Sequence, residues 1–204
     1  MSKEEKSQTG NSWKDYVLPC VYGPLMVLQV ILVLIYYNYL GLDFCCNVGW
    51  IVLAASAVFG WLPILTLRRK GGVSKGKSYV HTTVLVDSGI YALVRHPQYL
   101  AGILIILALI LISQHWLSVI SGVIALPLYH IDARRADKGL IAKFGEDYKR
   151  YMQKVPRMNF VVGIIRLLRR RKKEQRAEGI WTLRSKGHPK SVNNLRADKV
   201  EMKL

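Results

Sequence analysis

Long stretches of apolar residues alternate with short polar segments along the first two thirds of this 204-residue chain. The first stretch covers about residues 17–40 and the second about residues 49–67, and neither contains a charged side chain. The third covers about residues 100–113, with a start at Pro97 because proline suits the first helical position. The fourth covers about residues 115–131. Because about 20 apolar residues span a bilayer as a helix, the pattern predicts about four transmembrane helices, the last two forming a tight hairpin.

The apolar stretches lack the polar stripe that a helix of a soluble protein shows along its exposed face. The first stretch is also too long for a cleaved signal peptide, and no small-residue cleavage site follows it. We therefore predict an all-α fold, a multi-pass membrane helix bundle rather than a soluble bundle or a secreted protein.

The basic residues are separated from the apolar stretches and give the chain a formal net charge of +17. Lys and Arg follow the second and the fourth stretch, whereas the connections 41–48 and 113–115 contain neither. The positive-inside rule then places both termini and the 68–96 connection in the cytoplasm. A chain with this much positive charge is also suited to binding nucleic acid. Attraction of its Lys and Arg side chains to anionic lipid headgroups explains the same excess of positive charge. We expect the bilayer, and no nucleic acid, as the partner of the basic tail.

Composition divides the chain into three parts. Residues 1–14 are polar and are expected to be flexible, residues 15–168 form the membrane domain, and residues 169–204 form a basic tail that is expected to be disordered. Apolar side chains at helical spacing predict a cytoplasmic amphipathic helix over residues 137–154. The three cysteines show no metal-ligand spacing, and we expect no metal site.

Two polar clusters border the third and fourth stretches. The first lies in residues 82–101 and includes Arg95 and His96 directly before Pro97. Proline disfavours helix at the preceding residue, so Arg95 and His96 are expected to cap the third helix, whose N-terminus favours a carboxylate. The second cluster, residues 130–137, ends the fourth stretch. A helical hairpin returns it to the side of His96, and we predict that both clusters share one cytoplasmic pocket.

At these residues the chain resembles a known superfamily. The segment GIYALVRHPQY at 89–99 is followed by FGEDYKRY at 144–151 and VPR at 155–157. The order of these motifs, with an apolar hairpin between the first two, is similar to that of the isoprenylcysteine carboxyl methyltransferases and phospholipid methyltransferases. The resemblance covers about residues 82–160.

The resemblance implies a membrane enzyme that transfers a methyl group from S-adenosylmethionine to a lipophilic acceptor. The acceptor classes are a prenylcysteine carboxylate, a phospholipid amine or another lipophilic small molecule. A carboxylate needs no general base, whereas an amine or a phenol must lose a proton, which His96 or an acid would take. The resemblance also implies catalytic roles for His96, Arg134 and Asp137. It implies that the cofactor lies against Thr83, Val84, Leu85, Val86, Tyr91, His96, Pro97, Gln98 and Tyr99.

The chain departs from the family pattern in the second cluster. Ala136 and Asp137 stand where the family has two glutamates, and Asp132 stands at the position of an upstream arginine. Arg134, Arg135 and Asp137 supply the charges in a different order.

Two other functions stay open. One is an NADPH-dependent membrane reductase of the sterol-reductase type, which carries a similar segment but places an acid soon after the tyrosine, where this chain has LAG at 100–102. The other is a non-catalytic membrane protein that retains the fold.

Overall fold

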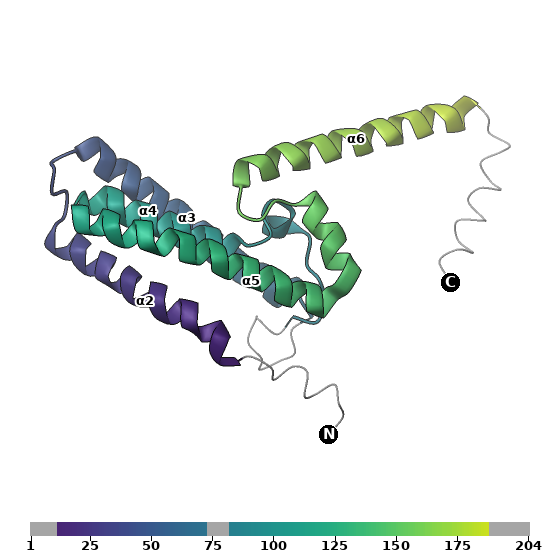
Figure 1. Ribbon diagram of the computed structural model, residues 1–204. Helices are drawn as coiled ribbons and strands as arrows, with labels where there is room; N and C mark the ends of the chain where they lie inside the picture. Colours follow the sequence, from purple (N-terminus) through teal and green to yellow (C-terminus); the bar gives the residue numbers. More distant parts are fainter. Residues whose placement is uncertain (1–11, 73–81, 188–204) are drawn as a thin grey trace, which may run out of the picture. The chain divides into compact units, whose positions relative to one another are not determined.

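The computed structural model describes residues 12–72 and 82–187, and these residues form five α-helices and one 3-10 helix without any strand (Figure 1). The predicted all-α fold is thus confirmed. Residues 1–14 were predicted to be flexible, but residues 12–14 belong to helix α2, which begins at Ser12, and residues 1–11 lie outside the described residues. The middle of the 68–96 connection and tail residues 188–204 also lie outside the described residues. The elements are α2 (Ser12–Ile35), α3 (Asp43–Lys70), η1 (Gly89–Ala92), α4 (Pro97–Ser113), α5 (Trp116–Lys154) and α6 (Phe160–Gly187).

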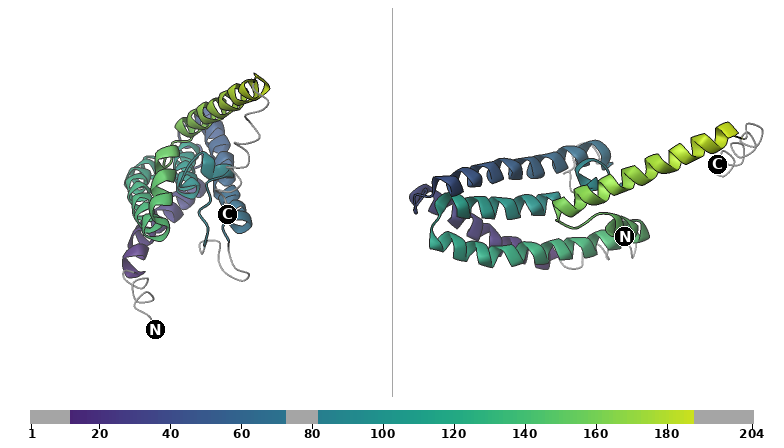
Figure 2. Two further views of the ribbon diagram at one scale, coloured as in Figure 1. Left: turned by 90° about the vertical axis from the view of Figure 1, so that its right-hand side faces the viewer. Right: turned by 90° about the horizontal axis from the view of Figure 1, so that it is seen from above.

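Helices α2 to α5 form an antiparallel bundle in which helices that follow each other in the chain run in opposite directions (Figures 1 and 2). The backbone N–H groups of Asn38 and Tyr39 donate to the carbonyl oxygens of Ile112 and Ser113, at 2.9 and 3.1 Å. The side chain of Gln114 donates to the side-chain oxygen of Asn38 at 2.7 Å. The α2–α3 and α4–α5 connections therefore lie together at one end, and the predicted hairpin of the last two helices is confirmed.

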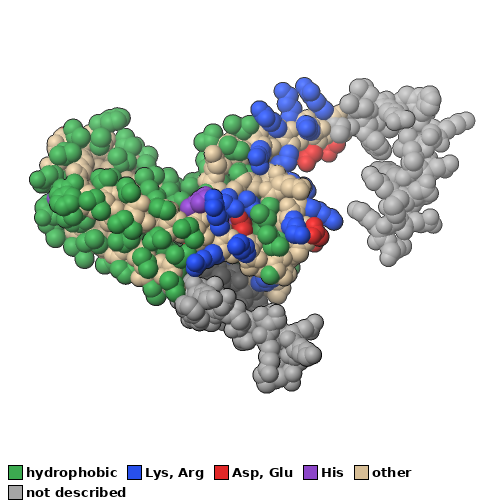
Figure 3. Space-filling view, viewed as in Figure 1, with side chains coloured by type: hydrophobic (Ala, Val, Ile, Leu, Met, Phe, Trp, Pro, Cys, Tyr) green, Lys and Arg blue, Asp and Glu red, His purple; other side chains and the backbone are tan. Residues whose placement is uncertain are grey.

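The bundle exposes apolar side chains that a soluble protein would bury. Leu34 on α2, Ile51 on α3 and Val123 on α5 are 78%, 69% and 63% exposed, and Figure 3 shows hydrophobic side chains covering one end of the bundle. Helices α2, α3 and α5 are each long and apolar enough to cross a membrane, and α4 is a shorter apolar helix. The chain is an integral membrane protein. The orientation of its termini relative to the two sides of the membrane remains a prediction.

Small residues bring the membrane helices close together. A Cβ atom on Gly49 of α3 would lie 2.7 Å from Cγ1 of Ile112 on α4. A Cβ atom on Gly102 of α4 would overlap the ring of Tyr129 on α5. Such close backbone approach is typical of membrane helices, which gain little hydrophobic free energy from association and depend on dense packing.

Helix α5 is longer than the sequence predicted. Its 39 residues correspond to about 58 Å at 1.5 Å per residue, nearly twice the hydrocarbon core of a bilayer. The part that follows Ile131 is rich in charged residues and therefore lies outside the hydrocarbon region. The predicted amphipathic helix 137–154 is a continuation of α5 rather than a separate element. It bends at Gly145, whose φ of 57° and ψ of −131° suit glycine alone.

We expected residues 169–204 to be disordered. For residues 169–187 this expectation is wrong, because α6 extends to Gly187. Its basic stretch is rich in Arg, Lys, Gln and Glu, which have high helix propensity, so a polar composition did not exclude a helix. Residues 161–187 belong to a unit distinct from the one that contains the bundle.

Candidate functional site

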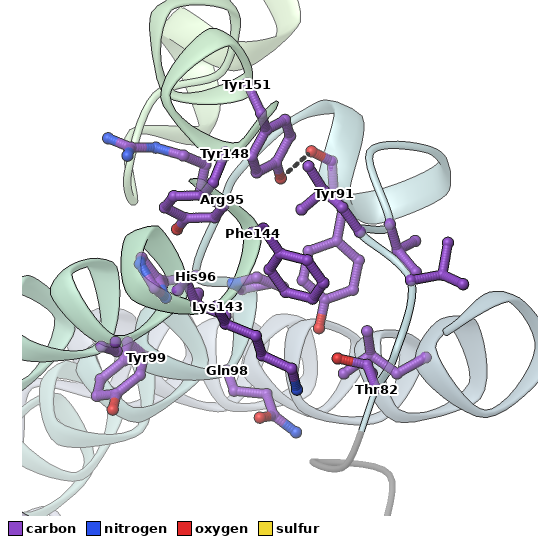
Figure 4. A pocket seen from close by; sticks show the side chains of 18 residues that line it. Thr82, Tyr91, Arg95, His96, Gln98, Tyr99, Lys143, Phe144, Tyr148 and Tyr151 are labelled. Carbon is purple, nitrogen blue, oxygen red and sulfur yellow. Dashed lines mark hydrogen bonds between the residues drawn. The ribbon is translucent and has the colours of Figure 1, made fainter. Parts of the chain in front are cut away.

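A cavity of about 420 Å³ lies at the end of the bundle where α3 ends and α4 begins (Figure 4). Its walls are the end of α3, the segment 82–86, η1, the first turn of α4 and the face of α5 that begins at Ala136. This volume falls in the range of about 300–1,000 Å³ that small-molecule sites occupy.

Most of the predicted cofactor residues line this cavity. Thr83 does not, because its hydroxyl donates to the carbonyl oxygen of Gly72 at 3.0 Å and ties segment 82–86 to the end of α3. Ala136 of the second polar cluster lines the same cavity, so the structure does bring the two clusters together. The predicted residues in the wall are Val84, Leu85, Val86, Tyr91, His96, Pro97, Gln98 and Tyr99.

The cap of α4 has the predicted geometry. His96, with φ of −121° and ψ of 66°, is the non-helical residue before Pro97 at the first helical position. The backbone N–H groups of Arg95 and His96 each donate at 3.0 Å, to the carbonyl oxygens of Pro156 and Arg157. The downstream motif VPR therefore holds the residues before α4 in place, a role that the sequence did not reveal.

Asp137 is the centre of a buried polar network behind the cavity wall. Its Oδ1 lies 2.7 Å from Nε2 of His96, accepts from the hydroxyl of Tyr148 at 2.7 Å and accepts from Arg95 at 3.3 Å. Its Oδ2 accepts from Nε of Arg157 at 2.7 Å. Burial raises the pKa of Asp137, but the hydrogen bonds from His96, Tyr148 and Arg157 outweigh it and hold the pKa well below its ordinary value. The carboxylate is ionised and fixes the orientation of the imidazole.

The structure does not bring the predicted catalytic Arg134 to the cavity. Its side chain is exposed and contributes nothing to the wall. At about 100° per residue, Arg134 lies about 160° around α5 from Ala136, so one helix cannot present both residues to one site. We therefore drop Arg134 from the site and keep His96, with Asp137 as the residue that positions it.

Three tyrosines in the wall have already committed their hydroxyl protons. Tyr99, Tyr148 and Tyr151 each donate to a protein oxygen, so their phenol oxygens offer only lone pairs to a ligand. In the part of the chain that the structure describes, no Asp or Glu side chain lines the cavity. Carboxylates instead lie behind two of the phenols. The acceptors are Asp132 for Tyr99 (3.2 Å), Asp137 for Tyr148 (2.7 Å) and the carbonyl oxygen of Tyr91 for Tyr151 (2.6 Å).

The sequence did not assign the cavity residues that follow Ala136 on α5. Tyr148 and Tyr151 lie on the predicted amphipathic helix, and both are buried in a cluster with Val155. Their second role in the cavity arises from the bend at Gly145, which a helical pattern does not show. Thr82 and Arg95 of the first polar cluster also line the cavity. The wall residues that the sequence did not assign are Leu67, Gly139, Leu140, Lys143 and Phe144.

The fold and the cavity define a class of protein, a helical membrane protein with an aromatic ligand site at one end of its bundle. The family model of phospholipid methyltransferases matches residues 44–144, about half of the chain. That segment contains α3, segment 82–86, α4 and α5 as far as Phe144, and therefore most of the cavity. Residues 44–144 thus match the phospholipid methyltransferase family, and this match is consistent with the superfamily whose motifs the chain carries. Searches of curated proteins and of solved structures give no match.

Proposed function

We propose that the protein transfers a methyl group from S-adenosylmethionine to an acceptor that reaches the cavity from the bilayer. The observation that carries this proposal is the set of phenol oxygens that can only accept hydrogen bonds. The donor molecule carries positive charge on its sulfonium and its ammonium group. Lone pairs of phenols and the faces of aromatic rings attract such cations.

Among the described residues, the basic side chains in the cavity wall are Arg95 and Lys143. Arg95 lies in the wall, but its guanidinium is buried and paired with Asp137 at 3.3 Å. Asp137 also pairs with Arg157, and Nζ of Lys143 lies 5.3 Å from the centroid of the Phe144 ring. The N-terminus of α4 at His96 offers a partial positive charge, which suits the single carboxylate of S-adenosylmethionine.

The protein contributes positioning and exclusion of water. When bound, S-adenosylmethionine supplies the methyl group as an electrophile activated by sulfonium charge, and transfer is an in-line displacement. The apolar residues Val84, Leu85 and Val86 provide a dry wall, while Asp137 holds His96 in one orientation. Fixed geometry and a dry site are the main sources of rate in such a displacement.

The acceptor is proposed to be lipophilic because the bundle carries an apolar surface along α2, α3 and α5. A prenylcysteine carboxylate, a phospholipid amine or another lipophilic small molecule would reach the site by diffusion within the bilayer.

We also propose that α6 faces anionic headgroups. Val161, Ile165 and Leu168 are exposed at helical spacing on one face, and Arg169–Lys173 are basic.

The proposal is tested by equilibrium binding to the protein purified into nanodiscs. We expect S-adenosylmethionine to bind and NADPH not to bind. His96→Ala and Tyr99→Phe should each weaken donor binding about tenfold, the value of one well-formed polar contact, whereas Arg134→Ala, on the far side of α5, should not. Binding of NADPH instead, or donor binding that neither variant alters, would contradict the proposal.

A further inference from the structure

A second buried carboxylate, Asp132, lies behind the cavity on the side of the bundle. Asp132 is 8% exposed, and its Oδ2 accepts from the hydroxyl of Tyr99 on α4 at 3.2 Å and from the hydroxyl of Tyr22 on α2 at 3.1 Å. Three helices therefore meet at one carboxylate oxygen. Of its two phenol partners, Tyr99 lines the cavity and Tyr22 does not.

The two buried carboxylates differ in their partners. Asp137 accepts from the guanidinium groups of Arg95 and Arg157 as well as from Tyr148, and these donors fix it as an anion. Among the described residues, no Lys, Arg or His makes an ion pair with Asp132. The two hydroxyl groups that donate to Asp132 carry no charge, and they can reorient when the carboxylate accepts a proton. Asp137 therefore suits a structural role, and Asp132 suits proton transfer.

The imidazole of His96 is the other group in the wall that could take a proton. Its Nε2 is engaged with Asp137 at 2.7 Å, which fixes the ring in the structural network and leaves Nδ1 as the nitrogen that could take a proton. Tyr99 stands at the border between the cavity and Asp132, and its oxygen offers lone pairs to the cavity because its proton is directed to the carboxylate. A ligand group that meets Tyr99 must therefore bring a hydrogen-bond donor.

We infer that Tyr99 and Asp132 act as a dyad that recognises the methyl acceptor through an N–H or O–H group and takes its proton. This inference rests on the proposed function and assigns a specificity role to Asp132. The nucleophilic nitrogen or oxygen of the acceptor forms a bond to the methyl carbon as the carbon–sulfur bond of the sulfonium donor breaks. The electron pair of that bond stays on sulfur, which becomes a neutral thioether. The acceptor's proton passes to the oxygen of Tyr99, and the hydroxyl proton of Tyr99 passes to Asp132.

The dyad also discriminates against one class of acceptor. An acceptor that presents a carboxylate would place a negative charge and no proton against the lone pairs of Tyr99, with the anionic Asp132 directly behind. Repulsion of this kind is an efficient source of specificity. The geometry therefore selects amines, phenols or alcohols over carboxylates.

The experiment measures binding of two matched lipids to the protein in phosphatidylcholine nanodiscs. Octadecylamine, protonated at neutral pH, and octadecyltrimethylammonium have the same charge and chain, but only the first has N–H groups. We expect wild-type protein to prefer octadecylamine about fivefold, the value of one net hydrogen bond. The preference should disappear in Tyr99→Phe and Asp132→Asn and persist in Asp132→Glu, which a purely structural role of Asp132 would not predict.

Tyr129→Phe is the matched control, because this hydroxyl donates to the sulfur of Met26 at 2.8 Å rather than to Asp132. A wild-type preference below about twofold would overturn the dyad, as would a preference that survives in both dyad variants or vanishes equally in the control. Binding of S-adenosylmethionine is measured on the same samples. Its absence would reject the proposed function, whereas donor binding without any N–H preference would reject the dyad alone.

Discussion

Replacing Asp137 by asparagine tests the network that holds the site together. The substitution keeps the size of the side chain but removes the charge that faces Arg95 and Arg157. The side chains of Arg95 and Asp137 are only 7% and 4% exposed, so solvent cannot replace the lost partner. Breaking a buried ion pair by removing one partner costs about 3–5 kcal/mol. Because Arg157 is 27% exposed and can turn toward water, the lower end of this range is expected.

A loss of about 3 kcal/mol corresponds to a decrease in melting temperature of about 6–12 °C for a domain of this size. Thermal unfolding in detergent, followed by circular dichroism, measures it. The control is Asp147→Asn, which removes an exposed pair with Arg150 at 4.0 Å and should change the melting temperature little. A decrease below about 2 °C for Asp137→Asn, or equal decreases for both variants, would refute the assignment of Asp137 as the centre of the network.

Three further predictions concern packing, backbone and pH. Gly102→Ala should lower the unfolding free energy by about 1–3 kcal/mol, because the new methyl group would overlap the ring of Tyr129. Gly23→Ala is the control and should not lower it, because the space around Gly23 is open. Urea or thermal unfolding compares the two variants. Gly145→Ala should lower the unfolding free energy by about 1–2 kcal/mol, because φ at this position is +57°. It should also weaken donor binding, because the bend at Gly145 brings the aromatic side chains that follow it to the cavity. An unchanged dissociation constant for the donor would contradict this. The ionised carboxylate of Asp137 stabilises the fold, because the pKa of Asp137 is lower in the folded than in the unfolded protein. This stabilisation is complete above the unfolded-state pKa of about 3.9 and is lost as the pH falls below that value. The melting temperature of the wild-type protein should therefore be flat from pH 7 to 5 and fall below pH 4, with a smaller decrease in Asp137→Asn.

The sequence predicted the bundle because membrane helices are encoded by composition alone. Uninterrupted apolar stretches locate α2, α3 and the start of α5, and Pro97 marks the start of α4 within a single residue. The non-helical cap at His96 followed from the steric effect of proline on its neighbour. These features are local, and local physics is sufficient to predict them.

The parts that the sequence did not predict depend on tertiary geometry. Asp132 and Asp137 stand five residues apart on one helix, yet one meets two phenols and the other meets two arginines. Which carboxylate receives which partner depends on where α2 and the VPR motif lie in space. Arg134 was assigned to the site by its charge, but its position around α5 excludes it. No pattern in the sequence shows that α5 continues beyond the membrane and bends at Gly145.

The central claim is that this cavity transfers a methyl group to a molecule of the bilayer. The most direct measurement incubates the protein, in membranes, with S-adenosylmethionine that carries a radioactive methyl group and then extracts the lipids into an organic phase. We predict label in the organic phase for wild-type protein and for Arg134→Ala, and about tenfold less label for His96→Ala when the donor concentration lies below the wild-type dissociation constant. Label that remains entirely with the donor, in a preparation that binds S-adenosylmethionine, would contradict the account.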